Sequence, residues 1–185
     1  MSDSWYKVDN VAKVFLATAS MRDPRVFRIS CTLQEQVDPD TLNEALRRTA
    51  QEWPQFQVTL HRGLFWHYFE STDLMPAAQP ETKAPCAPLY TPERRNRLIY
   101  RVTYFGARIN LEMFHAITDG NGGLLYLKSI VRNYLALRHP GELDSVPSPN
   151  SASAGDLAQD SFRNFYGGTR RRKAEKKTKV YRPHG

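Results

Sequence analysis

The residues best suited to chemistry in this chain are His115 and Asp119, followed directly by Gly120. The segment before His115 alternates between two faces, as a strand does. Ile109, Leu111, Met113 and His115 fall on one face, and Asn110, Glu112 and Phe114 fall on the other. His115 therefore takes the last place on an otherwise apolar face, a position that suits a general base in a cleft.

A tight turn and an amphipathic helix are predicted after His115. Gly120 is flexible, and Gly122 and Gly123 can adopt backbone angles that are closed to other residues. From position 124 onward the apolar residues recur at helical spacing: Leu124, Leu127, Ile130, Val131, Tyr134 and Leu135. Residues 108–137 thus predict a strand, a turn and a helix that together hold His115 and Asp119 in place.

The residues alone leave two other interpretations of His115 open. It could be a core histidine that hydrogen-bonds its neighbours, or it could bind a metal ion with Asp119. Two ligands without a clustered third do not make a metal site, so no metal is expected. Other side chains have structural interpretations: Trp53, Phe65 and Trp66 as core residues, and His61, His67, His139 and His184 as residues without partners at useful spacing.

The segment His115-x-x-x-Asp119-Gly120 resembles the HxxxDG motif of the chloramphenicol acetyltransferase-like superfamily. The resemblance covers residues 5–137 and is closest to bacterial alcohol acetyltransferases and condensation-domain-like proteins. It extends through Val37-Asp38-Pro39, Leu42-x-x-Ala45-Leu46, Trp53-Pro54-x-Phe56, Gly63-Leu-Phe65-Trp66 and residues 108–115. Many condensation domains have a second histidine where this chain has Phe114.

The resemblance implies an α/β (α+β) fold: the N-terminal half of the superfamily fold, with a mixed, largely antiparallel sheet and helices packed on one face. It implies an acyltransferase in which His115 activates an acceptor hydroxyl, with acetyl-CoA or another acyl-CoA as cosubstrate, no bound cofactor and no covalent intermediate. Asp119 and Gly120 would shape the motif. Asp119 would do so through an ion pair, with Arg28 or Arg101 as its candidate partner.

Superfamily members are about twice as long, and two similar halves enclose a tunnel around the motif histidine. The DFGWG-type motif of the second half is absent from this chain. The chain is therefore expected to be a fragment, a truncated product or a half that pairs with another chain, and to be inactive or incomplete alone. Its expected partners are acyl-CoA, a small alcohol acceptor, and a C-terminal half or second chain. The alternatives are a catalytically silent interaction module and a nonribosomal-peptide condensation-like domain.

Charge is concentrated at the end of the sequence. Residues 167–185 contain eight Lys and Arg and one Glu, a net charge of +7, whereas the remaining 18 basic and 18 acidic residues cancel. The basic character therefore belongs to a tail, and nucleic-acid binding is not expected of the globular part. We predict an acyltransferase-like half-domain over residues 1–144, a connector with a weak helix over 145–166, and a mobile basic tail over 167–185.

The remaining features predict one domain with a core and a cytoplasmic location. The sequence has no apolar run long enough to span a membrane and no secretory signal, and its two cysteines are expected to be reduced, with Cys31 in the core. Helices are predicted from Asp9 or Asn10 to 20 and over 39–53. Strands are predicted over 26–33, 55–62, 64–70 and 97–105, a long loop over 71–92, and a two-residue turn at 106–107.

Overall fold

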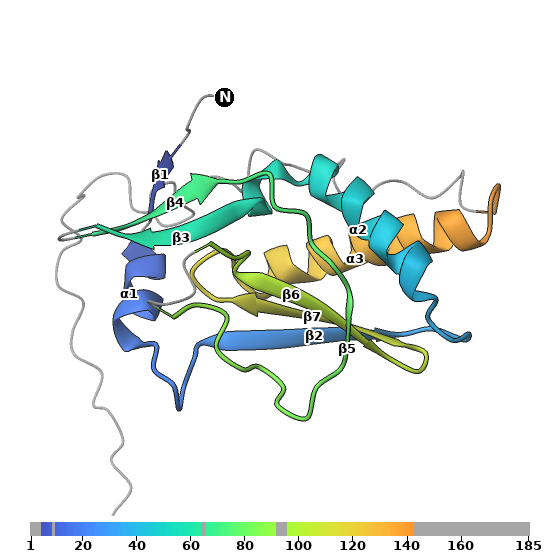
Figure 1. Ribbon diagram of the computed structural model, residues 1–185, viewed down its shortest axis with the longest axis horizontal. Coiled ribbons are helices and arrows are strands. Elements are labelled where there is room, and N and C mark those ends of the chain that lie inside the picture. Colours follow the sequence, from blue (N-terminus) through green and yellow to red (C-terminus); the bar gives the residue numbers. More distant parts are fainter. Residues whose placement is uncertain (1–4, 9, 64–65, 92–95, 143–185) are drawn as a thin grey trace, which may run out of the picture.

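The computed structural model describes residues 5–8, 10–63, 66–91 and 96–142. Over these residues the chain forms two sheets and three α-helices (Figure 1). The helices are α1 (Asn10–Thr18), α2 (Pro39–Glu52) and α3 (Gly120–Arg138). The strands are β1 (Trp5–Lys7), β2 (Val26–Thr32), β3 (Val58–Arg62), β4 (His67–Ser71), β5 (Gln79–Pro80), β6 (Tyr100–Phe105) and β7 (Arg108–Phe114). The predicted connector and tail lie outside the described residues.

The larger sheet has the order β2-β7-β6-β5, and only the short β5 runs parallel to its neighbour. The smaller sheet, β1-β4-β3, is antiparallel throughout. Helices α2 and α3 pack on one face of the larger sheet, and the chain between β4 and β6 crosses its other face (Figure 1). The predicted α/β class, with a mixed and largely antiparallel sheet covered by helices on one face, is confirmed.

Local sequence explains the boundaries of several elements. Asp38 caps α2 by accepting a hydrogen bond from the Thr41 backbone N–H at 2.8 Å, and Pro39 occupies the first turn, where its missing N–H has no cost. Gly106, with φ of +56°, and Ala107 form the tight turn between β6 and β7. A left-handed backbone angle of this kind favours glycine.

The core consists of two apolar clusters. The first lies between α2, α3 and the larger sheet and includes Trp53, Leu111 and Tyr126. The second joins α1, the smaller sheet and the end of β7; its members are Val8, Ala12, Val58, Leu60, Leu89, Ile99, Phe114 and Ala116. Ile117 packs against both clusters. The two clusters therefore meet immediately after β7.

Two sequence expectations about residues 55–66 are wrong. The strand predicted from residue 55 begins only at Val58, because Pro54–Phe56 forms a 3-10 turn in which the Phe56 ring stacks on Trp53. Trp66 is 57% exposed and not a core residue, because it precedes β4 and its carbonyl closes a turn with the Gly63 N–H. Trp53 is fully buried, as predicted. Leu64 and Phe65 lie outside the described residues.

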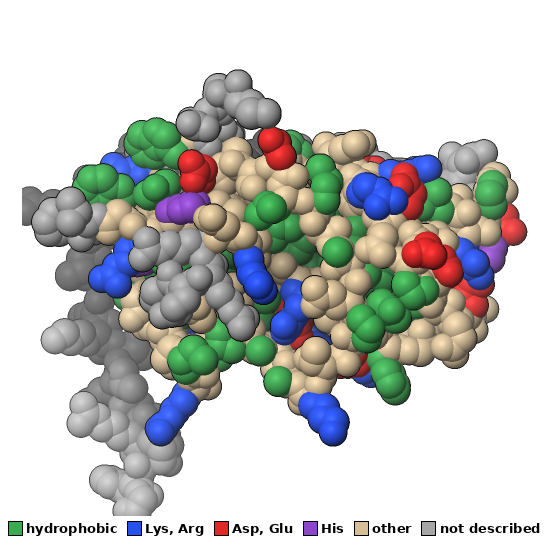
Figure 2. All heavy atoms as spheres, viewed as in Figure 1, with side chains coloured by type: hydrophobic (Ala, Val, Ile, Leu, Met, Phe, Trp, Pro, Cys, Tyr) green, Lys and Arg blue, Asp and Glu red, His purple; other side chains and the backbone are tan. Residues whose placement is uncertain are grey.

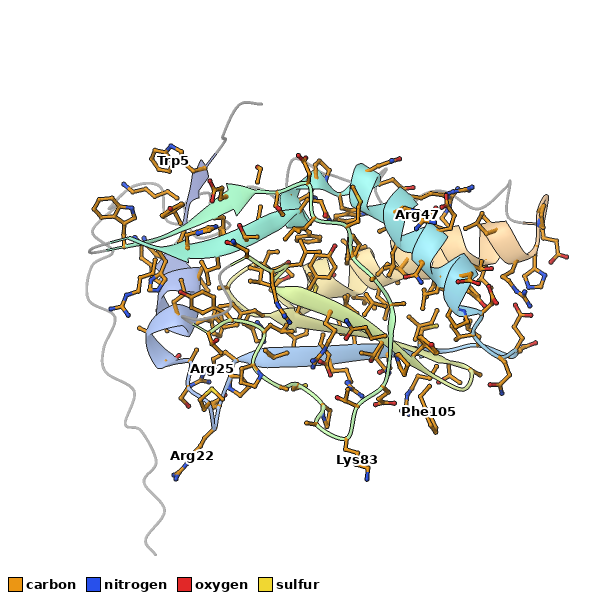
Figure 3. All side chains as sticks on the ribbon, viewed as in Figure 1. Trp5, Arg22, Arg25, Arg47, Lys83 and Phe105 are labelled. Carbon is orange, nitrogen blue, oxygen red and sulfur yellow. The ribbon has the colours of Figure 1, made fainter. Side chains whose placement is uncertain are left out.

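Exposed apolar side chains are dispersed over the surface. On the face shown in Figure 2 they form several separate groups. Trp5 and Phe105, both more than 60% exposed, lie at opposite sides of the view in Figure 3. Among the described residues, no helix has the length and hydropathy needed to cross a bilayer.

Candidate active site around His115

His115 is the first residue after β7, at the junction of the two apolar clusters. Its backbone N–H donates to the Arg25 carbonyl at 2.9 Å, which ties it to the start of β2. Arg25 has a φ of +54°, a left-handed conformation that is uncommon for a residue with a side chain. Figure 3 shows Arg25 at the bend between α1 and β2. The backbone of His115 is therefore anchored by a residue some ninety positions earlier in the chain.

The imidazole ring of His115 lies between two aromatic side chains. Phe15 of α1 stacks on it with ring centroids 4.7 Å apart and planes 13° apart. Phe27 of β2 contacts it at 4.4 Å with the planes tilted by 42°. Neither aromatic residue belongs to the HxxxDG segment, and sequence reasoning did not find them. Phe15 and Phe27 could have been found only from the packing of α1 and β2 around the end of β7.

The two ring nitrogens of His115 have different surroundings. Nδ1 is buried and has no well-aligned hydrogen bond in the described part of the chain, and Nε2 is not among the buried unpaired atoms there. Burial is the main cause that lowers the pKa of His115, and Arg25 adds to it; the Thr118 backbone and the Asp119 carboxylate act in the opposite direction. The lowered pKa favours the uncharged ring at neutral pH, and with Nδ1 buried we expect Nε2 to be the nitrogen that accepts a proton.

Asp119 begins α3 as its N-cap. Its Oδ1 accepts a hydrogen bond from the Gly122 N–H at 2.8 Å, which satisfies one of the free donors at the helix start. The expected partners Arg28 and Arg101 do not pair with Asp119, because both guanidinium groups bind Glu112. The described residues form no ion pair with Asp119. Its contribution to the turn is thus a helix cap.

Two of the three glycines at the start of α3 provide close packing, and none of the three has a left-handed backbone angle. Gly120, Gly122 and Gly123 are the first, third and fourth residues of α3, which starts earlier than predicted. A Cβ on Gly123 would lie 2.8 Å from the Phe27 ring, and one on Gly122 would lie 1.9 Å from Thr118 Oγ1. Nothing lies within 4 Å of the corresponding position on Gly120. Gly123 therefore lets α3 approach β2 closely enough for Phe27 to reach the imidazole.

A buried ion network lies on the opposite face of the sheet. Glu112 is fully buried and stands directly across from Arg28 on β2 and Arg101 on β6. It accepts hydrogen bonds from Arg28 Nε at 2.8 Å, Arg101 Nε at 2.9 Å and the Cys86 backbone N–H at 2.9 Å. Burial alone would raise the pKa of Glu112, but these donors outweigh it and lower the pKa.

The chain between β4 and β6 extends this network. Glu81 pairs with both Arg28 and Arg108, and the Glu81 N–H donates to the Tyr104 carbonyl at 2.9 Å. Sequence reasoning missed the role of Glu112. The turn at 106–107 nevertheless fixes the register that sets Arg101 opposite Glu112, so that pair could have been read from the hairpin.

Most other predicted or excluded site residues lie away from this constellation. Phe114 is buried in the second cluster. His61 contacts Glu70, and His139 contacts Glu35. His67 packs near Tyr90, and His184 lies outside the described residues. Among the described residues, no group of three or more His, Cys, Asp or Glu side chains could hold a metal ion.

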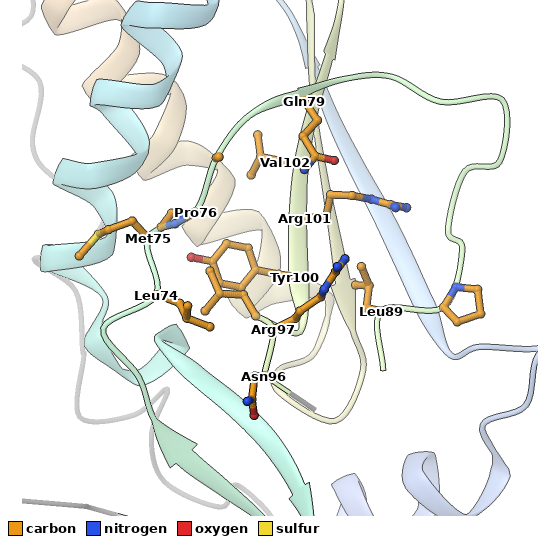
Figure 4. A pocket seen from close by; sticks show the side chains of 13 residues that line it. Leu74, Met75, Pro76, Gln79, Leu89, Asn96, Arg97, Tyr100, Arg101 and Val102 are labelled. Carbon is orange, nitrogen blue, oxygen red and sulfur yellow. The ribbon is translucent and has the colours of Figure 1, made fainter. Parts of the chain in front are cut away.

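A pocket of about 300 Å³ opens beside β6, between that strand and the loop that follows β4 (Figure 4). Its walls are mostly apolar and include Leu74, Leu89 and Val102, with Asn96 and Arg97 at one end. His115 does not line it. The pocket and the imidazole are thus separate features of the molecule.

No protein-family model matches this chain, and no curated protein matches it. Solved structures do. The starter condensation domain of rhizomide synthetase RzmA is similar with a TM-score of 0.56 at 13% identity, over 73% of this chain and 38% of that one. Polyketide synthase associated protein 5 from Mycobacterium tuberculosis is similar with a TM-score of 0.55 at 14% identity, over 74% and 34% of the two chains.

The X-domain from teicoplanin biosynthesis gives a TM-score of 0.55 at 14% identity, over 69% of this chain and 31% of that one. This chain spans less than half of the length of each of these neighbours. They define its class: the chain has a condensation-domain-like α/β fold, at partial coverage of that fold.

Proposed function

We propose that this chain forms part of an acyl-CoA-dependent O-acyltransferase in which His115 is the general base. The observation that carries the proposal is an imidazole with Nδ1 buried and with its pKa lowered mainly by burial, in a segment that reads His115-x-x-x-Asp119-Gly120. The donor is supported by a neighbour: a variant of the RzmA starter condensation domain has been solved in complex with C8-CoA.

In the proposed reaction, Nε2 of His115 takes the proton of an acceptor hydroxyl as its oxygen attacks the thioester carbonyl of acyl-CoA. The tetrahedral intermediate then collapses, the carbon–sulfur bond breaks, and the new ester forms. The leaving thiolate recovers the proton from the His115 imidazolium, so the enzyme returns to its starting state. Burial favours the neutral imidazole before the reaction, which suits a group that must accept a proton.

The finer assignment is an alcohol acetyltransferase, with acetyl-CoA as donor and a small alcohol as acceptor. Phe114 supports it over a nonribosomal-peptide condensation domain, since many of those have histidine at this position. The proposal places Asp119 and Gly120 in structural roles: Asp119 caps α3, and Gly120 continues the turn into the helix.

The first prediction is kinetic. In the protein in its natural form, with any continuation or partner chain, His115→Ala should lower the rate of thiol release from acetyl-CoA by about 10²–10⁴-fold, because a positioned base contributes that much. Melting temperature should change little. His139→Ala is the matched control and should retain activity. His139 lies at the end of α3, where its ring contacts Glu35.

The pH profile sharpens this test. Because the pKa of His115 is lowered, the acid limb of kcat/KM should fall at a lower pH than an exposed histidine would give. Wild-type turnover in His115→Ala would end the assignment of the base. A natural form that neither binds nor turns over acyl-CoA would favour the interaction module instead; its support is the exposed Val11 and Val14 on α1 and Leu124 on α3, two elements that border His115.

A further inference from the structure

The imidazole of His115 is held by residues far from it in the sequence. Phe15 covers one side of the ring almost in parallel, at 4.7 Å, and Phe27 contacts it at 4.4 Å. Both aromatic side chains are themselves partly buried and pack against the core clusters. Rings anchored in this way cannot turn aside freely, because tightly packed interiors leave little free volume.

We propose that Phe15 and Phe27 are positioning residues that form an apolar clamp, fixing the His115 imidazole in one orientation with Nε2 directed to the acceptor. As a statement about the reaction, this rests on the proposed acyl transfer. The clamp itself is a property of the folded chain and can be tested without turnover.

The clamp has two opposing effects on the pKa of the His115 imidazole. A ring face covered by aromatic carbon loses its water, which disfavours the imidazolium form. An aromatic face also attracts a cation, an effect that would stabilise the imidazolium. Burial is the main cause that lowers the pKa of His115, which is the direction expected from the loss of water.

Charged groups near the ring do not by themselves account for the lowered pKa of His115. Asp119, in the turn after His115, raises its pKa, and Arg25, before β2, lowers it. Asp23 is paired with Arg25 at 3.3 Å, and Lys13 on α1 contacts Asn10. Arg28 on β2 is directed to Glu81 and Glu112 on the other side of the sheet. Removing the aromatic side chains that cover the ring should therefore change the pKa of His115 most.

Gly123 connects the clamp to the glycine-bearing motif. The Phe27 ring lies 2.8 Å from where a Cβ of Gly123 would stand, so only glycine leaves room for the ring in its present place. The turn thus does two things: Asp119 caps α3, and Gly123 admits the aromatic side chain that contacts the base.

The test uses NMR titration of the histidine ring signals in Phe15→Ala and Phe27→Ala, with His115→Gln to assign the His115 resonance. Water should reach the opened ring face, so the pKa of His115 should rise toward that of an exposed histidine. The proposed reaction requires the proton on Nδ1 and a free Nε2, and the ¹⁵N shifts should show a weaker preference for that tautomer in both alanine variants. Phe69→Ala is the control: Phe69 packs against the second cluster without stacking on His115, and it should leave the titration unchanged.

Phe15→Leu and Phe27→Leu keep apolar volume and guard against loss of the fold. They should leave the pKa of His115 nearly unchanged while lowering kcat more than they raise KM, because the ring is still dry but less well oriented. Unchanged titration and tautomer in both alanine variants would overturn the clamp, even if His115→Ala abolishes activity. Shifted titrations in a natural form without acyl transfer would instead uphold the clamp and remove the proposed reaction.

Discussion

At the scale of single residues, Gly123 illustrates how one missing methyl group can determine a site. The first turn of α3 contains three glycines, and only their surroundings distinguish them. Gly123 faces the Phe27 ring and the Ile29 side chain, whereas Gly120 faces open space. A helix former in place of either glycine removes the same excess freedom of the unfolded chain, so any difference reports on contacts.

We predict that Gly123→Ala lowers the free energy of unfolding, although alanine in a helix is usually favoured over glycine by about 1 kcal/mol. The added methyl would meet ring carbons of Phe27 at 2.8 and 2.9 Å, so the ring or the helix must shift. Gly120→Ala is the matched control and should be neutral or stabilising. Chemical denaturation of both variants measures the difference; equal stabilisation by the two substitutions would contradict the close approach.

At the scale of elements, the chain between β4 and β6 is attached to the sheet by the pairing of β5 with β6 and by charge. Glu81 and the Cys86 N–H are its two points of contact with the Arg28, Arg101 and Glu112 network. These contacts convert what would be the solvent-facing side of the sheet into a buried layer, in which Asn110 and Glu112 are fully buried. The loop is therefore part of the fold and not an optional insertion.

We expect Glu112→Gln to lower the free energy of unfolding by about 3–5 kcal/mol, because removing one member of a buried ion network leaves the other charges uncompensated. Glu44→Gln, which breaks an exposed cluster with Arg47 and Arg48 on α2, should cost less than about 1 kcal/mol. Thermal melting separates the two. Similar melting temperatures for both variants would show that the network contributes little.

The pH dependence of the same network has a defined sign. The pKa of Glu112 is lowered in the folded chain, so its stabilising contribution is present above the unfolded-state pKa and is lost as pH falls through the folded-state pKa. The folded-state pKa of His115 is lowered as well. For an imidazole this favours the neutral form, whereas for the Glu112 carboxyl group it favours the charged form. The unfolded state therefore gains a proton first as pH falls below an ordinary histidine pKa, and stability decreases from that point.

Elements with strong local signals were predictable from sequence. The Asp38 and Pro39 pair marked the start of α2, and the turn at 106–107 fixed the register of β6 and β7. The alternation before His115 put Leu111 and Met113 in the core, as observed. These predictions succeed because a cap, a turn and a strand alternation depend on neighbouring residues only.

Features that depend on distant contacts were not predictable in the same way. β5 exists only because the loop reaches β6, and the partners of Arg28 and Arg101 follow from sheet order, which one sequence does not reveal. The aromatic cover of His115 comes from α1 and β2. The assignment of His115 as the base remains a prediction, and so do the structural roles of Asp119 and Gly120 in activity.

At the scale of the whole molecule, the two apolar clusters share a boundary at the end of β7, where Ile117 packs against both. Thr59 of β3 also bridges to Leu98, close to β6, and the Phe114 N–H donates to the Ile99 carbonyl. Clusters joined by a strand and by backbone hydrogen bonds should lose their structure together.

A destabilising substitution in the second cluster should therefore also shift the unfolding transition of the first cluster. We predict that Leu60→Ala lowers the free energy of unfolding by about 2–5 kcal/mol and shifts the fluorescence transition of Trp53, buried in the first cluster, together with far-UV circular dichroism. Leu74→Ala, at a 41% exposed position, should leave both transitions in place. A Trp53 transition that stays fixed while the dichroism moves would show that the clusters unfold separately.

The double burial of β7 also bears on how the sequence can drift over time. Six of its seven residues are buried, three of them facing the helices and the others facing the loop or the second cluster. A strand with one solvent-exposed face can accept neutral substitutions at every second position, but both faces of β7 are buried. The strand that leads to His115 should therefore be the slowest-changing stretch among descendants of this gene, whether or not they keep the histidine's chemistry.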